Sequence, residues 1–137
     1  MRKLSELIRK DAARLKQQMR SLPRLLGNEV VNHTLENFKL GGFRVSEGSF
    51  EPWPDRKAVR GRRVFSRRAL LVKSGALRRS IRVVSAGPTS ALVASRLPYS
   101  KRHNEGLKGM PQRKFLGDSR ALRKRLKRLI QQTLKKP

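Results

Sequence analysis

Three consecutive stretches decide the fold class of this 137-residue chain: Ile81-Arg-Val-Val-Ser-Ala86, Gly87-Pro-Thr-Ser90 and Ala91-Leu-Val-Ala-Ser-Arg96. The first and third contain valine and other residues that favour strands. The second combines glycine and proline with small polar residues, as turns do. Two short strands joined by a four-residue turn predict an antiparallel hairpin over 81–96, with one face on helices. The predicted fold class is therefore α+β, with a small antiparallel sheet that includes this hairpin.

Helical spacing of apolar residues runs through the first 40 residues. Its two parts are Leu4, Leu7, Ile8, Leu15, Met19 and Leu22, then Leu26, Val30, Val31, Leu35 and Phe38. Pro23 interrupts the pattern between them, because proline lacks the N–H that a helical hydrogen bond needs. The pair Gly41-Gly42 ends the second part. We expect N-terminal helices over 1–40, arranged as a helical hairpin or as one long helix broken at Pro23.

The end of the chain predicts an amphipathic helix that Asp118 or Ser119 can cap. Its apolar stripe consists of Leu122, Leu126, Leu129, Ile130 and Leu134. Residues 41–69 are rich in glycine, proline, arginine and serine, which predicts a long basic loop. Residues 70–117 predict sheet and loops, with one helical turn after Ser74 and an irregular segment over 103–117. We expect a single domain over 1–137, in which 118–137 form the basic helix.

Charge is distributed unevenly along the chain, which carries +26 in total. Residues 1–55 hold ten basic and seven acidic residues, a net +3, whereas residues 56–137 hold 25 basic and two acidic residues, a net +23. No acidic residue occurs from Arg56 to Asn104, so local ion pairs do not neutralise these cations. Nucleic acid is the commonest partner of such a surface, and a solvated basic surface is the alternative.

Two basic segments, the loop and the last helix, contain the candidate DNA-facing residues. These are Arg56, Lys57, Arg60, Arg62, Arg63, Arg67 and Arg68 in the loop and Arg120, Arg123, Lys124 and Lys127 in the helix. Cations around a helix attract phosphates without selecting a base sequence, so we expect non-specific contact with double-stranded DNA. The alternative is a helix packed on the core with a solvated charged face. Membrane binding is not expected of this helix, because residues 119–137 contain no aromatic residue.

Signatures of catalysis and of metal binding are scarce. The chain has no cysteine and two histidines, and His103 with Glu105 has the His-x-Glu spacing of zinc deaminases without their cysteines. We interpret this pair as fixing a loop or facing a neighbouring subunit. Trp53 and Tyr99 can in principle stack on single-stranded bases, but isolated aromatic residues more often anchor a core. No phosphate-binding glycine motif occurs. We expect no enzymatic activity, no metal and no cofactor.

Three further segments flank the hairpin in a fixed order. They are Leu70-Leu-Val-Lys-Ser-Gly-Ala-Leu-Arg-Arg-Ser-Ile81, then Tyr99 with His103-Asn-Glu-Gly106, then Met110-Pro-Gln-Arg-Lys-Phe-Leu-Gly117. In order and spacing this pattern resembles the phage virion morphogenesis family of Mu-like tail completion proteins. The helical N-terminal part, the step from Gly41-Gly42 to Trp53 and the closing helix are similar as well. The resemblance thus spans most of the chain.

The resemblance implies a structural virion protein of a tailed bacteriophage that completes the tail and joins it to the head at the neck, without catalysis. It implies a homo-oligomeric ring near the DNA path, in contact with other neck, connector or tail proteins, and the host cytoplasm as the place of assembly. The motif residues then pack the core or contact a subunit: Gly75, Leu77, Ser80, Ile81, Tyr99, His103, Gly106, Pro111, Arg113, Phe115 and Gly117. The alternative is a basic nucleic-acid-binding protein, either ribosome-associated or DNA-compacting.

Overall fold

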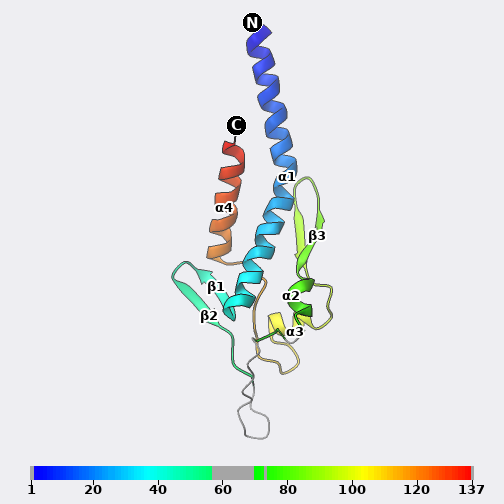
Figure 1. Ribbon diagram of the computed structural model, residues 1–137, viewed down its shortest axis with the longest axis vertical. Coiled ribbons are helices and arrows are strands. Elements are labelled where there is room, and N and C mark those ends of the chain that lie inside the picture. The colour runs from blue at the N-terminus through cyan, green and yellow to red at the C-terminus, as the bar shows by residue number, and fades with distance from the viewer. Residues whose placement is uncertain (1, 57–69, 73, 137) are drawn as a thin grey trace.

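The computed structural model describes residues 2–56, 70–72 and 74–136 and confirms the α+β class. Its elements in chain order are α1 (Arg2–Leu40), β1 (Gly42–Ser46), β2 (Ser49–Pro52), α2 (Ala76–Ser80), β3 (Arg82–Ala86), β4 (Ala91–Ala94), α3 (Ser100–Glu105) and α4 (Arg120–Lys135). The strands form two separate antiparallel pairs, β1–β2 and β3–β4. Figure 1 shows that α1 is the long axis of the molecule and that the other elements gather around its C-terminal half.

A single continuous helix, α1, stands where the sequence predicted either a helical hairpin or one long helix broken at Pro23. The expected interruption at Pro23 is wrong, because α1 is helical from Arg2 to Leu40, a length of about 58 Å. Pro23 removes the hydrogen bond that the Met19 carbonyl would accept. Its ring is buried, however, and contacts with other elements keep the chain helical where local preference does not.

The β3–β4 hairpin confirms the prediction for residues 81–96. Arg82 pairs with Ala94 and Ala86 with Ala91, with an irregularity between them, and the Gly87 N–H donates to the Ser90 carbonyl at 2.7 Å across the turn. The second hairpin corrects the prediction of a continuous loop over 41–69, because Phe43 of β1 pairs with Glu51 of β2. Glycine, proline and glutamate weaken the strand signal of that stretch, so its pairing was not evident.

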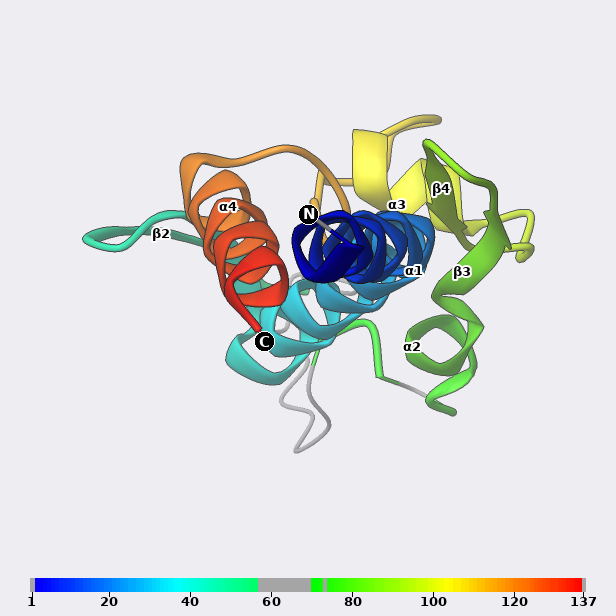
Figure 2. The ribbon, with the colours of Figure 1, turned by 90° about the horizontal axis from the view of Figure 1, so that it is seen from above.

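The C-terminal half of α1 lies between two layers, α4 with β1 on one side and the β3–β4 hairpin on the other (Figure 2). α4 runs antiparallel to α1, as Figure 1 shows. Gly27 lets the hairpin approach α1 closely, because a Cβ at this position would lie 2.9 Å from Val83 Cγ2. The Ser119 hydroxyl caps α4 by accepting from the Leu122 N–H at 3.1 Å, as predicted for this residue.

The core is an aromatic cluster at the C-terminal end of α1. Its buried members are Phe38, Trp53, Leu77, Ile81 and Phe115. The ring of Phe38 meets that of Trp53 edge-on at 5.5 Å between centroids and lies 5.0 Å from that of Phe115. Trp53 is therefore an anchor of the core, while Tyr99 stays exposed. Segments that are distant in sequence share this one cluster, which defines a single hydrophobic centre.

One further difference concerns the segment after β4. The structure forms a short helix, α3, where the sequence predicted an irregular connection from His103 onward. Gly106 ends this helix at φ 70°, a left-handed conformation that suits glycine, and a Cβ there would lie 2.8 Å from that of Gln112. Residues 107–119 then cross to the start of α4 without forming a helix or strand.

Candidate functional site

The family-like motif residues converge on one irregular segment, residues 112–116, which we call the clamped segment. It has no regular secondary structure, yet side chains from three other parts of the chain bind its backbone. A buried backbone without such partners would cost free energy for each unpaired polar group. The motif therefore encodes a segment whose hydrogen bonds are supplied by side chains instead of by a neighbouring strand.

Asn104 supplies most of these bonds from the end of α3. Its Oδ1 accepts from the Phe115 N–H at 2.9 Å and from the Leu116 N–H at 3.0 Å, and its Nδ2 donates to the Leu116 carbonyl at 2.9 Å. In addition, Gln112 Nε2 donates a hydrogen bond to the Asn104 carbonyl at 3.2 Å. One asparagine side chain thus pairs with the backbone of the clamped segment as the edge of a strand would.

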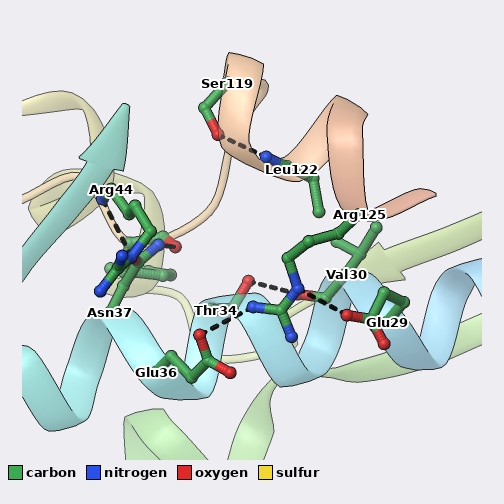
Figure 3. A network of polar contacts seen from close by, with 10 residues as sticks. Glu29, Val30, Thr34, Glu36, Asn37, Arg44, Ser119, Leu122 and Arg125 are labelled. Atoms are coloured by element: carbon green, nitrogen blue, oxygen red, sulfur yellow. Dashed lines mark hydrogen bonds and ion pairs between the residues drawn. The ribbon is translucent and has the colours of Figure 1, made fainter. Parts of the chain in front are cut away.

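Asn37 and Trp53 hold the other side of the clamped segment. Asn37 is fully buried in α1, donates from Nδ2 to the Phe115 carbonyl at 3.0 Å and accepts from the Arg44 N–H at 3.1 Å (Figure 3). Trp53 Nε1 donates to the Lys114 carbonyl at 2.8 Å. Sequence reasoning missed Asn37. The signal available was a polar residue in the buried register of the helix, directly before Phe38.

Arg113 is buried, and its guanidinium binds backbone carbonyls of the segment that follows β2. Nε donates to the Pro54 carbonyl and Nη2 to the Asp55 carbonyl, both at 2.9 Å. Its own N–H donates to the His103 carbonyl at 2.8 Å. Burial lowers the pKa of Arg113, and the nearby charge of Arg56 lowers it further. This arginine is 7% exposed, so it is placed to lock two connections together, not to meet phosphates in solvent.

A cavity of about 360 Å³ lies beside this arginine. Motif residues from three segments line it, namely Gly75, Leu77, Tyr99, His103 and Arg113, together with Arg56. The His103 ring meets the Tyr99 ring edge-on at 6.1 Å, and burial followed by the charge of Arg113 lowers the pKa of His103. Within the described part of the chain, no three histidine, cysteine or carboxylate side chains gather as a metal site would require.

The remaining motif residues lie close to the same end of the molecule. Leu77 and Ile81 are buried in the core cluster, and Ser80 exchanges a hydrogen bond of 2.6 Å with Ser95. Gly75 precedes α2, and the half-buried Pro111 and Gly117 flank the clamped segment. The structure thus places seven of the eleven motif residues in the core cluster or the cavity wall, namely Gly75, Leu77, Ile81, Tyr99, His103, Arg113 and Phe115.

The basic candidates of α4 lie on a different surface. Arg120, Arg123, Lys124 and Lys127 are exposed and share one face, at positions i, i+3, i+4 and i+7. Two are already paired: Arg123 with Asp118, and Lys124 with Glu47 at 2.8 Å. Hydrogen bonds from Arg123 and Lys124 lower the pKa of Asp118 and of Glu47, respectively. With the carboxylates that the structure describes, Arg120 and Lys127 form no ion pair.

Arg125, on the opposite face of α4, fixes this helix to α1. Its guanidinium donates to Glu29 at 2.6 Å and to Glu36 at 2.7 Å (Figure 3). Burial by itself lowers the pKa of Arg125, but the hydrogen bonds with Glu36 and Glu29 outweigh it and raise the pKa. The available sequence signal was the spacing of these two glutamates, which places both on one face of the predicted helix, but their partner was not predicted.

Residues 57–69, which contain most of the basic candidates of the predicted loop, lie outside the part of the chain that the structure describes. Arg56 is half-buried beside the cavity, whereas Lys57, Arg60, Arg62, Arg63, Arg67 and Arg68 lie outside the described residues. Of the DNA-facing candidates, the structure therefore positions Arg56 and the four residues of α4, and it brings only those of α4 onto one exposed face.

Comparison with protein families gives the decisive observation. The model of the phage virion morphogenesis family matches residues 1–135. The chain belongs to the phage virion morphogenesis family. No curated protein and no solved structure matches it. In this virion morphogenesis protein, residues of the three motif segments line the cavity, and two of these segments meet at the clamped segment. No helix in the described residues is long and apolar enough to cross a membrane.

Proposed function

We propose that this protein completes the tail of a tailed bacteriophage and joins it to the head at the neck, as a structural component of the virion. Family membership over residues 1–135 carries this proposal. It is supported by the use that the structure makes of the motif: Asn104, Arg113 and Phe115 hold an irregular segment and a core. Hydrogen bonds from side chains to backbone carbonyls and amides hold these segments in one conformation. This suits a protein that presents a fixed surface for assembly.

The absence of catalysis belongs to the same proposal. Catalysis by acid, base or nucleophile needs reactive groups that meet in one site. Among the described residues that line the cavity, the polar and titratable side chains are those of Arg56, Ser74, Tyr99, His103 and Arg113, and Arg113 is already bound to two carbonyls. Glu105, two residues from His103, is exposed at the end of α3. These features favour a role in positioning and contact over a role in bond cleavage.

A homo-oligomeric ring near the DNA path is the arrangement that best accounts for the exposed positive charge. Repeated copies would set the exposed cations of α4 around a duplex, where they attract phosphates without reading bases. Apolar side chains that a monomer leaves exposed, such as Phe50 and Leu92, would be covered by neighbouring subunits or by connector and tail proteins. Assembly then takes place in the host cytoplasm, and the protein ends in the virion.

Electron microscopy of particles from a phage with this gene deleted tests the proposal. We expect filled heads and separate tails that fail to join, and restoration of joined particles by the gene supplied in trans. As a matched pair, Asn104→Ala breaks the clamped segment, whereas Asn28→Ala changes an exposed asparagine of α1. Only the first is expected to lose complementation. Normal infectious particles from the deletion would contradict the proposal.

The high positive charge favours one other candidate, a basic nucleic-acid-binding protein. That function requires tight binding by the free chain to a duplex, with log affinity falling steeply against log salt. Replacing Arg120 and Lys127 with glutamine should flatten the salt slope by about 0.9 for each phosphate that the variant no longer neutralises. The control replaces Lys10 and Lys16 of α1. Tight binding together with normal particles from the deletion would establish the alternative.

A further inference from the structure

The N-terminal part of α1 extends past every other element (Figure 1). Gln18 lies where the end of α4 meets α1, and its Nε2 donates to the Lys136 carbonyl at 3.1 Å. Before Gln18, α1 carries an apolar stripe of Leu4, Leu7, Ile8 and Leu15, continued by Met19. These five side chains are between 41% and 63% exposed. An isolated helix with such a stripe gains stability by burying it against another element.

The apolar stripe leads into a groove. Met19 belongs to both, and the groove of about 540 Å³ continues along α1 over Pro23, Gly27 and Val30. Its walls are the turn of the β3–β4 hairpin at Pro88 and, on the other side, Leu126 of α4. None of the residues that line it is charged. Stripe and groove together form one largely apolar surface along the helix axis. Asp11, seven residues after Leu4 and four before Leu15, falls on the same face, and its carboxylate is paired with Arg14.

Cations flank this surface on both sides. Residues 2–22 hold seven basic residues and two acidic ones, a net +5, and one of the acids, Asp11, is paired with Arg14 at 3.5 Å. The facing end of α4, residues 127–136, contains four basic residues and no acid. A partner must therefore offer apolar side chains in the centre and negative charge at the edges.

We propose that the stripe and groove bind an acidic amphipathic α-helix of a partner protein. Apolar residues at helical spacing along an axis fit a second helix, which places its own apolar face along the seam. Glutamate and aspartate beside that face would meet the lysines and arginines of α1 and α4. The inference goes beyond tail completion, because it assigns the chemistry of the partner without depending on where in the particle the protein stands.

Three other occupants fit this surface less well. A second copy would bring its own net +5 against the first, with two carboxylates to offset it. A membrane surface would suit a stripe with bulky aromatic residues, and residues 2–22 contain none; a flat bilayer also leaves a walled groove unfilled. DNA would meet the cations but not the leucines, because phosphates offer no apolar surface to cover them.

Binding of synthetic helical peptides to the full chain, followed by fluorescence anisotropy, tests the proposal. The probe is a peptide of about 21 residues, long enough to follow the stripe, with leucines at helical spacing and glutamates between them. One control replaces the glutamates with lysines, and a second keeps the composition but scrambles the leucines. We expect the acidic amphipathic probe to bind at least about tenfold more tightly than either control. Equal binding of the scrambled peptide, or none of the three binding, would overturn the proposal.

A matched pair of variants locates the binding on the stripe. Ile8→Gln with Leu15→Gln removes apolar side chains without changing charge, whereas Ala13→Gln changes an exposed residue on the opposite face. We expect the double variant to lose probe affinity at least about tenfold and Ala13→Gln to keep it, with unchanged circular dichroism for both. Unchanged affinity in the double variant would refute the assignment.

Sedimentation and vesicle flotation examine the other occupants with the same variants. A dimer of the free chain that Ile8→Gln with Leu15→Gln dissolves would assign the surface to a second copy and overturn the proposal. Flotation with anionic vesicles that the same change abolishes would assign it to a membrane and overturn it likewise. If particles from the deleted phage are normal while the acidic probe still binds, the proposed function fails and this inference stands.

Discussion

The two halves of α1 carry the same kind of apolar pattern but meet different surroundings. From Pro23 to Leu40 the apolar face lies between α4, β1 and the β3–β4 hairpin, and Phe38 is 1% exposed. From Arg2 to Gln18 the apolar face is in solvent. Helical periodicity thus indicates which side of a helix can be buried. Whether it is buried depends on elements that arrive from elsewhere in the chain or from another protein.

The two halves of α1 also differ in their polar contacts. In the buried half, polar contacts lie inside or beside the apolar ones. Asn37 of α1 forms a hydrogen bond with the clamped segment, and Arg125 of α4 forms ion pairs with α1, so each contact joins α1 to one particular segment. Before Gln18, the side-chain hydrogen bond of Ser5 and the ion pair of Arg14 with Asp11 both stay within α1. The following changes are ordered by the size of the expected effect.

Phe38→Ala should break the buried half most severely. It removes a ring that contacts Trp53 and Phe115, and large-to-small changes at buried phenylalanine cost about 3–5 kcal/mol of unfolding free energy. Leu7→Ala on the exposed half should change it by less than about 0.5 kcal/mol. Urea denaturation followed by circular dichroism measures both. Equal losses would show that the N-terminal half is covered in the free protein.

Asn37→Ala comes next, because it leaves the Phe115 carbonyl and the Arg44 N–H buried without their side-chain partner. Unsatisfied buried groups of this kind should cost about 2–3 kcal/mol. Asn28→Ala, on the exposed face of the same helix, is the control and should stay within about 0.5 kcal/mol. Denaturation curves decide the matter, and a loss as small as that of the control would refute the clamp as a source of stability.

Gly27→Val tests the close approach of α1 and the hairpin. Its side chain would collide with Val83 and Ala91, and we expect a loss of about 1–2 kcal/mol from overpacking. Gly48→Val places the same side chain in the turn between β1 and β2, where no atom lies within 4 Å of the added Cβ. The midpoints of thermal unfolding compare the two variants. A stabilising effect at Gly27 would show that the hairpin shifts freely.

Acidification should weaken the buried half through His33. Burial, followed by the charge of Arg125, lowers the pKa of His33 in the folded state; Arg44 lowers it too, while Glu36 and Glu29 act in the opposite direction. The unfolded chain then binds a proton at higher pH than the folded chain. The full stability is present above the ordinary pKa of about 6.5 and is lost as the pH falls from there toward the lower folded pKa.

Replacing this histidine tests the pH effect. In His33→Gln, unfolding free energy measured by urea titration should depend less on pH between about 6.5 and 5 than in the parent chain. His103→Gln is a useful comparison, because burial lowers the pKa of His103 as well. An unchanged slope in His33→Gln would contradict the assignment to this residue.

Much of the fold followed from short-range patterns. Valines around Gly87-Pro88 predicted the β3–β4 hairpin. Asp118 and Ser119 before a leucine stripe predicted the start of α4, where Ser119 is the cap, because both signals act over a few residues. The order of the motif segments predicted the family. The break at Pro23, the loop at β1–β2 and the irregular connection at α3 were wrong. At Pro23, contacts with other elements outweighed local preference, whereas at β1–β2 glycine, proline and glutamate weakened the strand signal.

The candidate site divides in the same way. The sequence identified Arg113, His103 and Phe115 as motif residues but not what they touch, and it did not single out Asn37. Three of the hydrogen bonds that hold the clamped segment join positions 78, 61 and 58 residues apart, and no local pattern encodes a contact at such a separation.

The sequence by itself determined the α+β class, the family, the concentration of positive charge after residue 56 and the faces of the helices that are able to pack. Tertiary structure decided which faces do pack: it buried one half of α1, clamped residues 112–116 with side chains and tied α4 to Glu29 and Glu36. The physical reason is the separation along the chain over which each kind of interaction acts. Backbone preferences and periodicity act between near neighbours, whereas burial and buried hydrogen bonds depend on partners that only the folded chain brings within reach.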